Sequence, residues 1–251
     1  MLNIERARKV LFIMYLSEKV GFSLEAVNPI ETSSDKLIMK GAIFDMDGVV
    51  VDNHKYHFKA WIAFSEKYNF ELNSTIYRDK FNGKTNKDLF TMLFGDLNVE
   101  QIQKFSIEKE EMYQKLYAED MKAHTGLFDF LELLKRHKFK IALGTSAPTS
   151  NVDFTLDRLK LRHYFDVIVD GSQVERGKPD PQVYELCAMK LGLQPKECFV
   201  FEDSLAGLES GERAGCKIIG VATSHEAYEL KPMTDFIIHD FTDAKSLLRI
   251  R

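Results

Sequence analysis

From residue 40 onward, short and nearly continuous apolar runs alternate with longer segments whose apolar residues recur at helical spacing. Six runs are typical of buried strands: "GAIFD", "KIALGTS", "DVIVDG", "CFVFED", "KIIGVA" and "FIIHD". Between most of them lie segments of helical length, at 126–138, 148–162, 180–192 and 204–215. Apolar strands that alternate with helices are typical of a parallel sheet covered on both faces. The pattern therefore predicts an α/β fold with a doubly wound parallel sheet.

Residues 53–122 interrupt this rhythm just after the first strand. They hold no convincing strand and instead predict several helices, at 54–68, 86–94 and 99–118. We therefore expect an α-helical cap domain at 53–122, inserted into an α/β core that comprises 37–52 and 123–251.

Residues 1–36 lie outside this pattern, and we interpret them as an N-terminal helical extension followed by a linker. Their apolar run, Val10 to Leu16, is too short to span a bilayer. Charged residues follow it without a small-residue cleavage site, which argues against a signal peptide. We expect a cytoplasmic protein without a membrane partner.

Composition narrows the function classes. The chain has 251 residues and a formal net charge of −4, and it lacks the basic footprint of a nucleic-acid-binding protein. Its three cysteines, Cys187, Cys198 and Cys216, show no zinc spacing, so we expect buried, reduced thiols. The mixed-charge stretch "IEKEE" at 107–111 predicts a solvated helix face. We expect a monomer.

Polar side chains follow several of the predicted strands at the point where each strand ends. In a doubly wound sheet, ligands bind beyond these carboxyl ends. A single acid there is explained by a turn or a helix cap, but a coincident set is not. The set comprises Asp45 and Asp47 after the first strand, Thr145 and Ser146 after the second, Lys178 in the loop after the third, and Glu202 and Asp203 after the fourth.

The residue types in this set indicate phosphate chemistry with Mg²⁺. Asp45, Asp47 and Asp203 offer the hard oxygen ligands that Mg²⁺ prefers, and a cation would remove the repulsion between them. The hydroxyl pair, its backbone and the lysine would hold phosphoryl oxygens. A carboxylate that attacks phosphorus forms an aspartyl-phosphate, and a second carboxylate nearby can move protons.

The motifs "FDMDGVVVD", "LGTS", "KPDP" and "FVFEDS", in that order, resemble the four motifs of the haloacid dehalogenase superfamily. Within it, "FDMDGVV.D...YHFKAW" is similar to the branch of β-phosphoglucomutases and sugar-phosphate phosphatases. The resemblance covers about residues 40–251. It implies Mg²⁺-dependent phosphoryl transfer from a small phosphorylated metabolite, with a mobile helical cap that excludes water.

The resemblance also implies roles for single residues. Asp45 corresponds to the nucleophile and Asp47 to the general acid/base, and both also contact the metal. Asp203 corresponds to a metal ligand and Glu202 to an adjacent ligand or an acid behind it. Thr145, Ser146 and Lys178 correspond to the phosphate-binding residues, His57 to a cap-hinge histidine and Lys109 to a cap lysine.

The sequence departs from the branch at two positions. Asn53 stands where Thr, Ser or Glu is common. Asn86, in "GKTNKD", stands where mutases of this branch carry an arginine for the distal phosphate, although Lys84 and Lys87 flank it. An arginine binds phosphate through two parallel hydrogen bonds, whereas the flanking lysines offer flexible point charges. We therefore expect a sugar-phosphate phosphatase, with a β-phosphoglucomutase-type phosphohexomutase as the alternative.

More distant interpretations are weaker. A haloacid dehalogenase needs neither a metal nor a second aspartate, so Asp47 and Asp203 argue against it. An inactive phosphosugar-binding module is disfavoured by the four intact motifs. "NGKT" at 82–85 lacks the first glycine of a P-loop, since Arg78 occupies that position. His54 and His57 are spaced for zinc, but no further ligand is evident.

Overall fold

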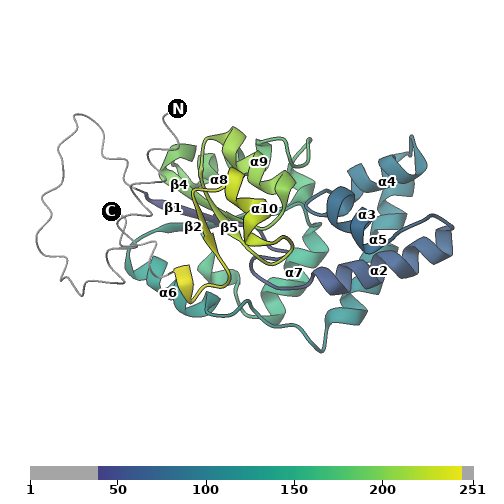
Figure 1. Ribbon diagram of the computed structural model, residues 1–251, viewed down its shortest axis with the longest axis horizontal. Helices are drawn as coiled ribbons and strands as arrows, with labels where there is room; N and C mark the ends of the chain where they lie inside the picture. Colours follow the sequence, from purple (N-terminus) through teal and green to yellow (C-terminus); the bar gives the residue numbers. More distant parts are fainter. Residues whose placement is uncertain (1–38, 245–251) are drawn as a thin grey trace, which may run out of the picture. The chain divides into compact units, whose positions relative to one another are not determined.

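The computed structural model describes residues 39–244. The helical extension predicted for 1–36 therefore lies outside the described residues. Figure 1 shows the sheet with helices α8, α9 and α10 on one face and α6 and α7 on the other, while α2 to α5 lie together beyond one end of the strands.

The sheet has six parallel strands in the order β3-β2-β1-β4-β5-β6. Its central strand β1 pairs with β2 on one side and β4 on the other, so that Gly41 lies opposite both Lys140 and Cys198. All six predicted strands are confirmed: β1 (Gly41–Phe44), β2 (Lys140–Gly144), β3 (Val167–Val169), β4 (Cys198–Glu202), β5 (Lys217–Val221) and β6 (Phe236–Ile238).

The helices of the described residues lie close to the predicted segments. Those in the insertion are α2 (His54–Tyr68), α3 (Ser74–Ile76), the π-helix η1 (Tyr77–Phe81), α4 (Asn86–Phe94) and α5 (Val99–Tyr117). The others are α6 (Leu127–Arg136), α7 (Thr149–Arg158), α8 (Gln182–Leu191), α9 (Leu205–Ala214) and α10 (Ala227–Leu230), with short 3₁₀ turns at Arg162–Tyr164, Gly171–Gln173, Pro195–Glu197 and Lys231–Met233. The periodicity did not indicate α3, the π-helix or α10.

Local chemistry explains where several helices begin and end. The side chains of Thr85, Asn98 and Ser204 each accept a hydrogen bond from a backbone N–H in the first turn of α4, α5 and α9. Gly192 and Gly215 end α8 and α9 in the left-handed conformation.

Alternation along the strands divides the core into two layers. Ala42 and Phe44 of β1 belong to the cluster that includes α6 and α7, whereas Ile43 belongs to the cluster that includes α8 and α9. Both faces of β1 are fully buried, which is why its sequence is apolar throughout. The three cysteines are buried and free, as predicted.

The inserted helices have an aromatic core of their own. Trp61 and Phe64 of α2 pack against Phe81, Leu89 and Phe90. The insertion is therefore an α-helical cap that follows β1, and the fold class predicted from the sequence is confirmed. The limits 53–122 for this cap remain a prediction. Among residues 39–244, no helix combines the length and the apolar character needed to cross a membrane.

We predict that Phe130→Ala lowers the free energy of unfolding by about 3–5 kcal/mol, because Phe130 is buried against Phe44, Phe201 and Phe241. Phe128→Ala, on the same helix but 42% exposed, should cost about 1 kcal/mol or less. Urea denaturation of both variants checks this. Equal losses would mean that the layer between α6 and the sheet is not a packed core.

Candidate active site

The site lies at the carboxyl ends of β1 and β4, which are neighbours in the sheet. Asp45 follows β1, and its backbone N–H donates to the carbonyl of Phe201 in β4. The chain then turns through Gly48, which has φ +81°. A Cβ atom at Gly48 would lie 2.2 Å from Oδ2 of Asp203, so only glycine lets the loop pass this carboxylate.

Lys178 joins the two strand ends through its ammonium group. Its Nζ donates to Oδ1 of Asp45 at 2.9 Å and to Oε1 of Glu202, and all three side chains are almost fully buried. Burial lowers the pKa of Lys178, but the two carboxylates raise it above its usual value. The lysine therefore stays charged and holds the Asp45 carboxyl in one position.

Glu202 orients Lys178, and both of its carboxylate oxygens accept further hydrogen bonds. Its Oε1 also accepts from the hydroxyl of Tyr184 at 2.8 Å. Its Oε2 accepts from the backbone N–H groups of Asp203 and Ser204 and from the Ser204 hydroxyl. The resemblance implies that Glu202 is either a metal ligand or an acid that supports the ligands from behind. Because its oxygens are occupied by these hydrogen bonds, the supporting role is favoured.

The carboxylates at this edge are crowded. Oxygen atoms of Asp45, Glu202 and Asp203 lie within 4.8 Å of one another. Burial raises the pKa of Asp45; Lys178 opposes this, but Glu202, Asp47 and Asp203 add to it. Such a buried surplus of negative charge is what a divalent cation would relieve.

The residues present fit a metal ion. Oδ1 of Asp203 is buried without a hydrogen-bond partner among the described residues, although a buried carboxylate oxygen without a partner is costly. Oδ1 of Asp45 accepts a hydrogen bond from Lys178, and the second carboxylate oxygen of Asp45 is available to a ligand. Asp45 and Asp203 therefore offer oxygen atoms that a cation would take up.

His54 contacts the same cluster from α2. Its Nε2 lies 2.6 Å from Oδ2 of Asp203. Burial lowers the pKa of His54, but the charge and hydrogen bond of Asp203 raise it, to about 9. His57, one turn further along α2, faces Asp47 instead, so the two histidines have different partners.

Asp47 is held by groups of the cap. Nδ2 of Asn53 donates to Oδ1 of Asp47 and to the Tyr113 hydroxyl, both at 2.6 Å. Nζ of Lys109 lies 3.1 Å from Nδ1 of His57. An ammonium only donates, so Nδ1 accepts and the ring proton lies on Nε2, which is 3.5 Å from Oδ2 of Asp47. Burial and Lys109 both lower the pKa of His57, in keeping with this neutral ring.

These contacts keep Asp47 ionised. Burial raises its pKa, but the imidazole of His57 and the amide of Asn53 lower it well below its usual range. The asparagine at position 53 thus hydrogen-bonds to the second aspartate directly. Asn53 is fully buried, so this contact forms part of the core of the site.

The loop after β2 lies beside these acids and also contacts the cap. Thr145 is buried, and its Oγ1 accepts from the N–H of Ala147 at 3.1 Å. The Ser146 hydroxyl donates to the carbonyl of Gly83 at 2.9 Å. The structure therefore shows the cap closed on this loop.

A pocket of about 60 Å³ separates cap and sheet edge. One water molecule needs about 10–15 Å³ of such space, so the closed pocket holds only a few water molecules. Most predicted site residues line it: Asp45, Asp47, His57, Lys84, Lys109, Thr145, Ser146, Lys178 and Asp203. Glu202 lies behind Lys178, and Lys87 is exposed and does not line the pocket.

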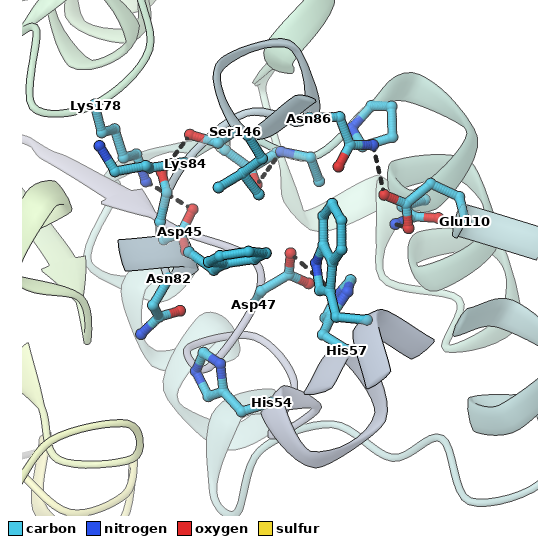
Figure 2. A pocket seen from close by; sticks show the side chains of 18 of the residues that line it. Asp45, Asp47, His54, His57, Asn82, Lys84, Asn86, Glu110, Ser146 and Lys178 are labelled. Carbon is cyan, nitrogen blue, oxygen red and sulfur yellow. Dashed lines mark hydrogen bonds and ion pairs between the residues drawn. The ribbon is translucent and has the colours of Figure 1, made fainter. Parts of the chain in front are cut away.

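Figure 2 shows two sides of this pocket. Asp45, Lys178 and Lys84 lie on one side, and Asn86 and Glu110 lie on the other.

Glu110 also lines the pocket and was not predicted from the sequence. The prediction of a solvated face for 107–111 is wrong for Lys109 and Glu110, each only 3% exposed, although Glu111 is exposed. Lys109 and Glu110 form an ion pair of 2.8 Å where α5 meets the core. The charges of these residues did not show that they are buried, because charges that form a pair are tolerated inside a protein.

Asn151 was also missed. It is fully buried at the start of α7 and donates to Oε2 of Glu110 at 2.6 Å. Asn86 donates to Oε1 of the same carboxylate at 2.7 Å. Asn86, for which the resemblance implies an arginine in mutases, therefore binds an acid of the cap.

Comparisons with known proteins show the family of the chain. Residues 42–221 match the model of the haloacid dehalogenase-like hydrolases. The chain is 32% identical over 212 residues to a phosphorylated carbohydrates phosphatase of Thermotoga maritima, covering 84% of this chain and 90% of that protein. It is 31% identical over 193 residues to the β-phosphoglucomutase of Bacillus subtilis, covering 73% and 83%.

The fold has a solved counterpart. The crystal structure of β-phosphoglucomutase from Clostridium difficile superposes with a TM-score of 0.74, covering 85% of this chain and 97% of that chain at 23% identity.

We predict that Lys178→Met lowers the free energy of unfolding by about 3–5 kcal/mol in EDTA at pH 7, because it leaves buried carboxylates without their cation. Asp45→Asn should leave stability unchanged or raise it, since it removes one of several crowded acids while Lys178 keeps Glu202. Lys190→Met, an exposed lysine on α8, is the control and should change stability by about 0.5 kcal/mol at most. A loss of less than about 1 kcal/mol for Lys178→Met would contradict this account of the site.

Proposed function

The chain belongs to the haloacid dehalogenase-like hydrolases, and from this membership we propose that it is a Mg²⁺-dependent phosphatase that hydrolyses a small sugar phosphate through an aspartyl-phosphate on Asp45. The observation that carries the proposal is the position of Asp45. One of its oxygens is fixed by Lys178, and it lies beside the unpartnered oxygen of Asp203.

The reaction divides between the two aspartates. The substrate, bound as its monoanion, first gives its proton to Asp47, which is ionised in the free site. A free oxygen of Asp45 then attacks phosphorus, the bond to the sugar oxygen breaks, and the sugar leaves as an alcohol after it takes that proton from Asp47. Water then attacks the phosphorus of the aspartyl-phosphate, gives its proton to Asp47, and releases inorganic phosphate and Asp45. The net change is one ester and one water converted into one alcohol and one phosphate.

Lys178, Thr145 and the backbone beside Ser146 would hold the phosphoryl oxygens. Lys178 keeps its charge in the buried site, where an electrostatic contact is stronger than in water. Asp45 and Asp203 would hold Mg²⁺, together with the backbone carbonyl of Asp47. When bound, Mg²⁺ neutralises negative charge on the acids and on the phosphate.

The cap would open to admit substrate, because the closed pocket has room for only a few water molecules. In the closed form, Asn53 hydrogen-bonds to Asp47, His57 lies beside the same carboxylate, and bulk water is excluded. The small phosphorylated partner that we propose agrees with the names of relatives, among them the phosphorylated carbohydrates phosphatase and a fructose-1-phosphate phosphatase of Escherichia coli.

Hydrolysis is favoured over mutase action by the contacts of the predicted cap cations. A mutase must seat the non-reacting phosphate firmly. Lys109 is already bound to Glu110 and His57, Lys87 is exposed outside the pocket, and Asn86 offers no charge. Lys84 alone of the predicted cap lysines lines the pocket with no ion pair among the described residues, and it lies on the side of Asp45 (Figure 2).

We predict that the chain releases inorganic phosphate from hexose or pentose monophosphates with Mg²⁺, and that EDTA abolishes this activity, because an unscreened acid cluster repels phosphate. Asp45→Asn should abolish turnover with the fold intact, since an amide cannot attack phosphorus. Phosphate release is measured alongside circular dichroism. Full activity in EDTA would refute the metal requirement, and substantial activity of a folded, pure Asp45→Asn protein would refute the nucleophile.

The choice between hydrolase and mutase is tested with β-glucose 1-phosphate, Mg²⁺ and a trace of bisphosphate primer. We predict glucose and free phosphate as products, because no arginine is among the residues of 39–244 that line the pocket. Glucose 6-phosphate formed much faster than free phosphate would decide for the mutase and would make Lys84 the seat of the second phosphate.

A further inference from the structure

We propose that Glu110 is a specificity-determining residue: it sets the charge of the pocket end that faces Asp45, so that this end accepts hydroxyl groups and rejects a second phosphate. The inference rests on the proposed phosphatase function, with the reacting phosphate at Asp45. It narrows the substrate class to monophosphates of polyhydroxylated compounds, as opposed to bisphosphates.

The position of Glu110 places it where the far end of a substrate would lie. It lines the pocket, and in Figure 2 it lies with Asn86 across the pocket from Asp45 and Lys178. A sugar held by its reacting phosphate at Asp45 would extend toward this carboxylate.

The charge of this end follows from the contacts of Glu110. Burial raises its pKa, but the charge of Lys109 and the hydrogen bonds of Lys109 and Asn86 lower it, so the group is ionised. Lys109 gives one N–H to Glu110 and one to His57. The negative charge therefore cancels the lysine, and no net positive charge remains for a phosphate dianion.

The same contacts suit hydroxyl groups. Asn86 and Asn151 each donate one N–H to Glu110, one from the cap and one from the core. An amide offers two donors and a carbonyl acceptor, and a carboxylate oxygen accepts more than one hydrogen bond. Sugar hydroxyls both donate and accept, so they match this surface, whereas a phosphate dianion only accepts and would be left beside a carboxylate.

A purely structural role for Glu110, as a latch between α5 and α7, predicts a different result. Loss of a latch weakens binding of every substrate by the same factor. Loss of a charge that faces the far end changes the preference between two ligands that differ only there. The ratio of two affinities is therefore the decisive measurement.

The experiment uses the Asp45→Asn protein, which would bind without turnover, in Mg²⁺. Titration calorimetry gives the dissociation constants of glucose 1-phosphate and glucose 1,6-bisphosphate with and without Glu110→Gln. We expect Glu110→Gln to shift the ratio of the two constants toward the bisphosphate by about tenfold or more, the scale for removing one charge in a poorly solvated site. Glu111→Gln, the same change at the next, exposed residue, should leave the ratio unchanged.

Glu110→Gln leaves Lys109 buried without its carboxylate and can prevent folding. Asn86→Lys then provides the second variant, because it places a cation beside Glu110 and keeps the acid. It should shift the ratio in the same direction. A ratio that moves by less than about twofold in the folded variant overturns the role of Glu110, while phosphate release from sugar phosphates by the wild-type chain still upholds the phosphatase. If the wild-type chain releases phosphate from no ester, the proposed function fails, and the role of Glu110 fails with it.

Discussion

The ammonium group of Lys178 lies between Asp45 and Glu202 and so couples the ends of two neighbouring strands. Without a cation there, the sheet edge would hold several buried carboxylates with little to offset their repulsion. With it, the Asp45 carboxyl is fixed, and the surplus charge that remains is the kind that a divalent metal and a phosphate together would balance. The position of this ammonium group depends on the rest of the fold: on the apolar strands, on the tight turn at Gly48 and on the contacts of Glu202.

The cap supplies the groups that face the core across the pocket. Most of them act through hydrogen bonds, and its buried lysine, Lys109, is paired with Glu110. Asn53 and His57 hold Asp47, and Ser146 and Asn151 of the core hold the cap in its closed position. This division suits a phosphatase whose core performs the same reaction on any ester, while the cap decides which ester fits. The pairing of Lys109 with Glu110 is central to that choice, because it removes a cation from the side of the pocket where a second phosphate would bind.

The core of the fold and the core of the site were predictable because both are governed by local pattern. Strands apolar on both faces indicate a covered parallel sheet, and acids at their ends fall on one edge whatever the loops do. Glu110 and Asn151 were not predictable in the same way. Each lies on a helix whose spacing shows which residues share a face but not what covers that face. The π-helix at Tyr77–Phe81 likewise depends on packing inside the cap and has no signal in the hydrophobic period.

The central claim is that the phosphoryl group passes through Asp45. The most direct test is rapid acid quenching of the wild-type enzyme during turnover of the ³²P-labelled monophosphate that it hydrolyses fastest, followed by digestion and peptide mapping. The account predicts a transient label on the peptide that contains Asp45, and hydroxylamine should remove it, as expected for an acyl phosphate. Phosphate release at full rate with no label on the protein, or with the label on another residue, would contradict the account.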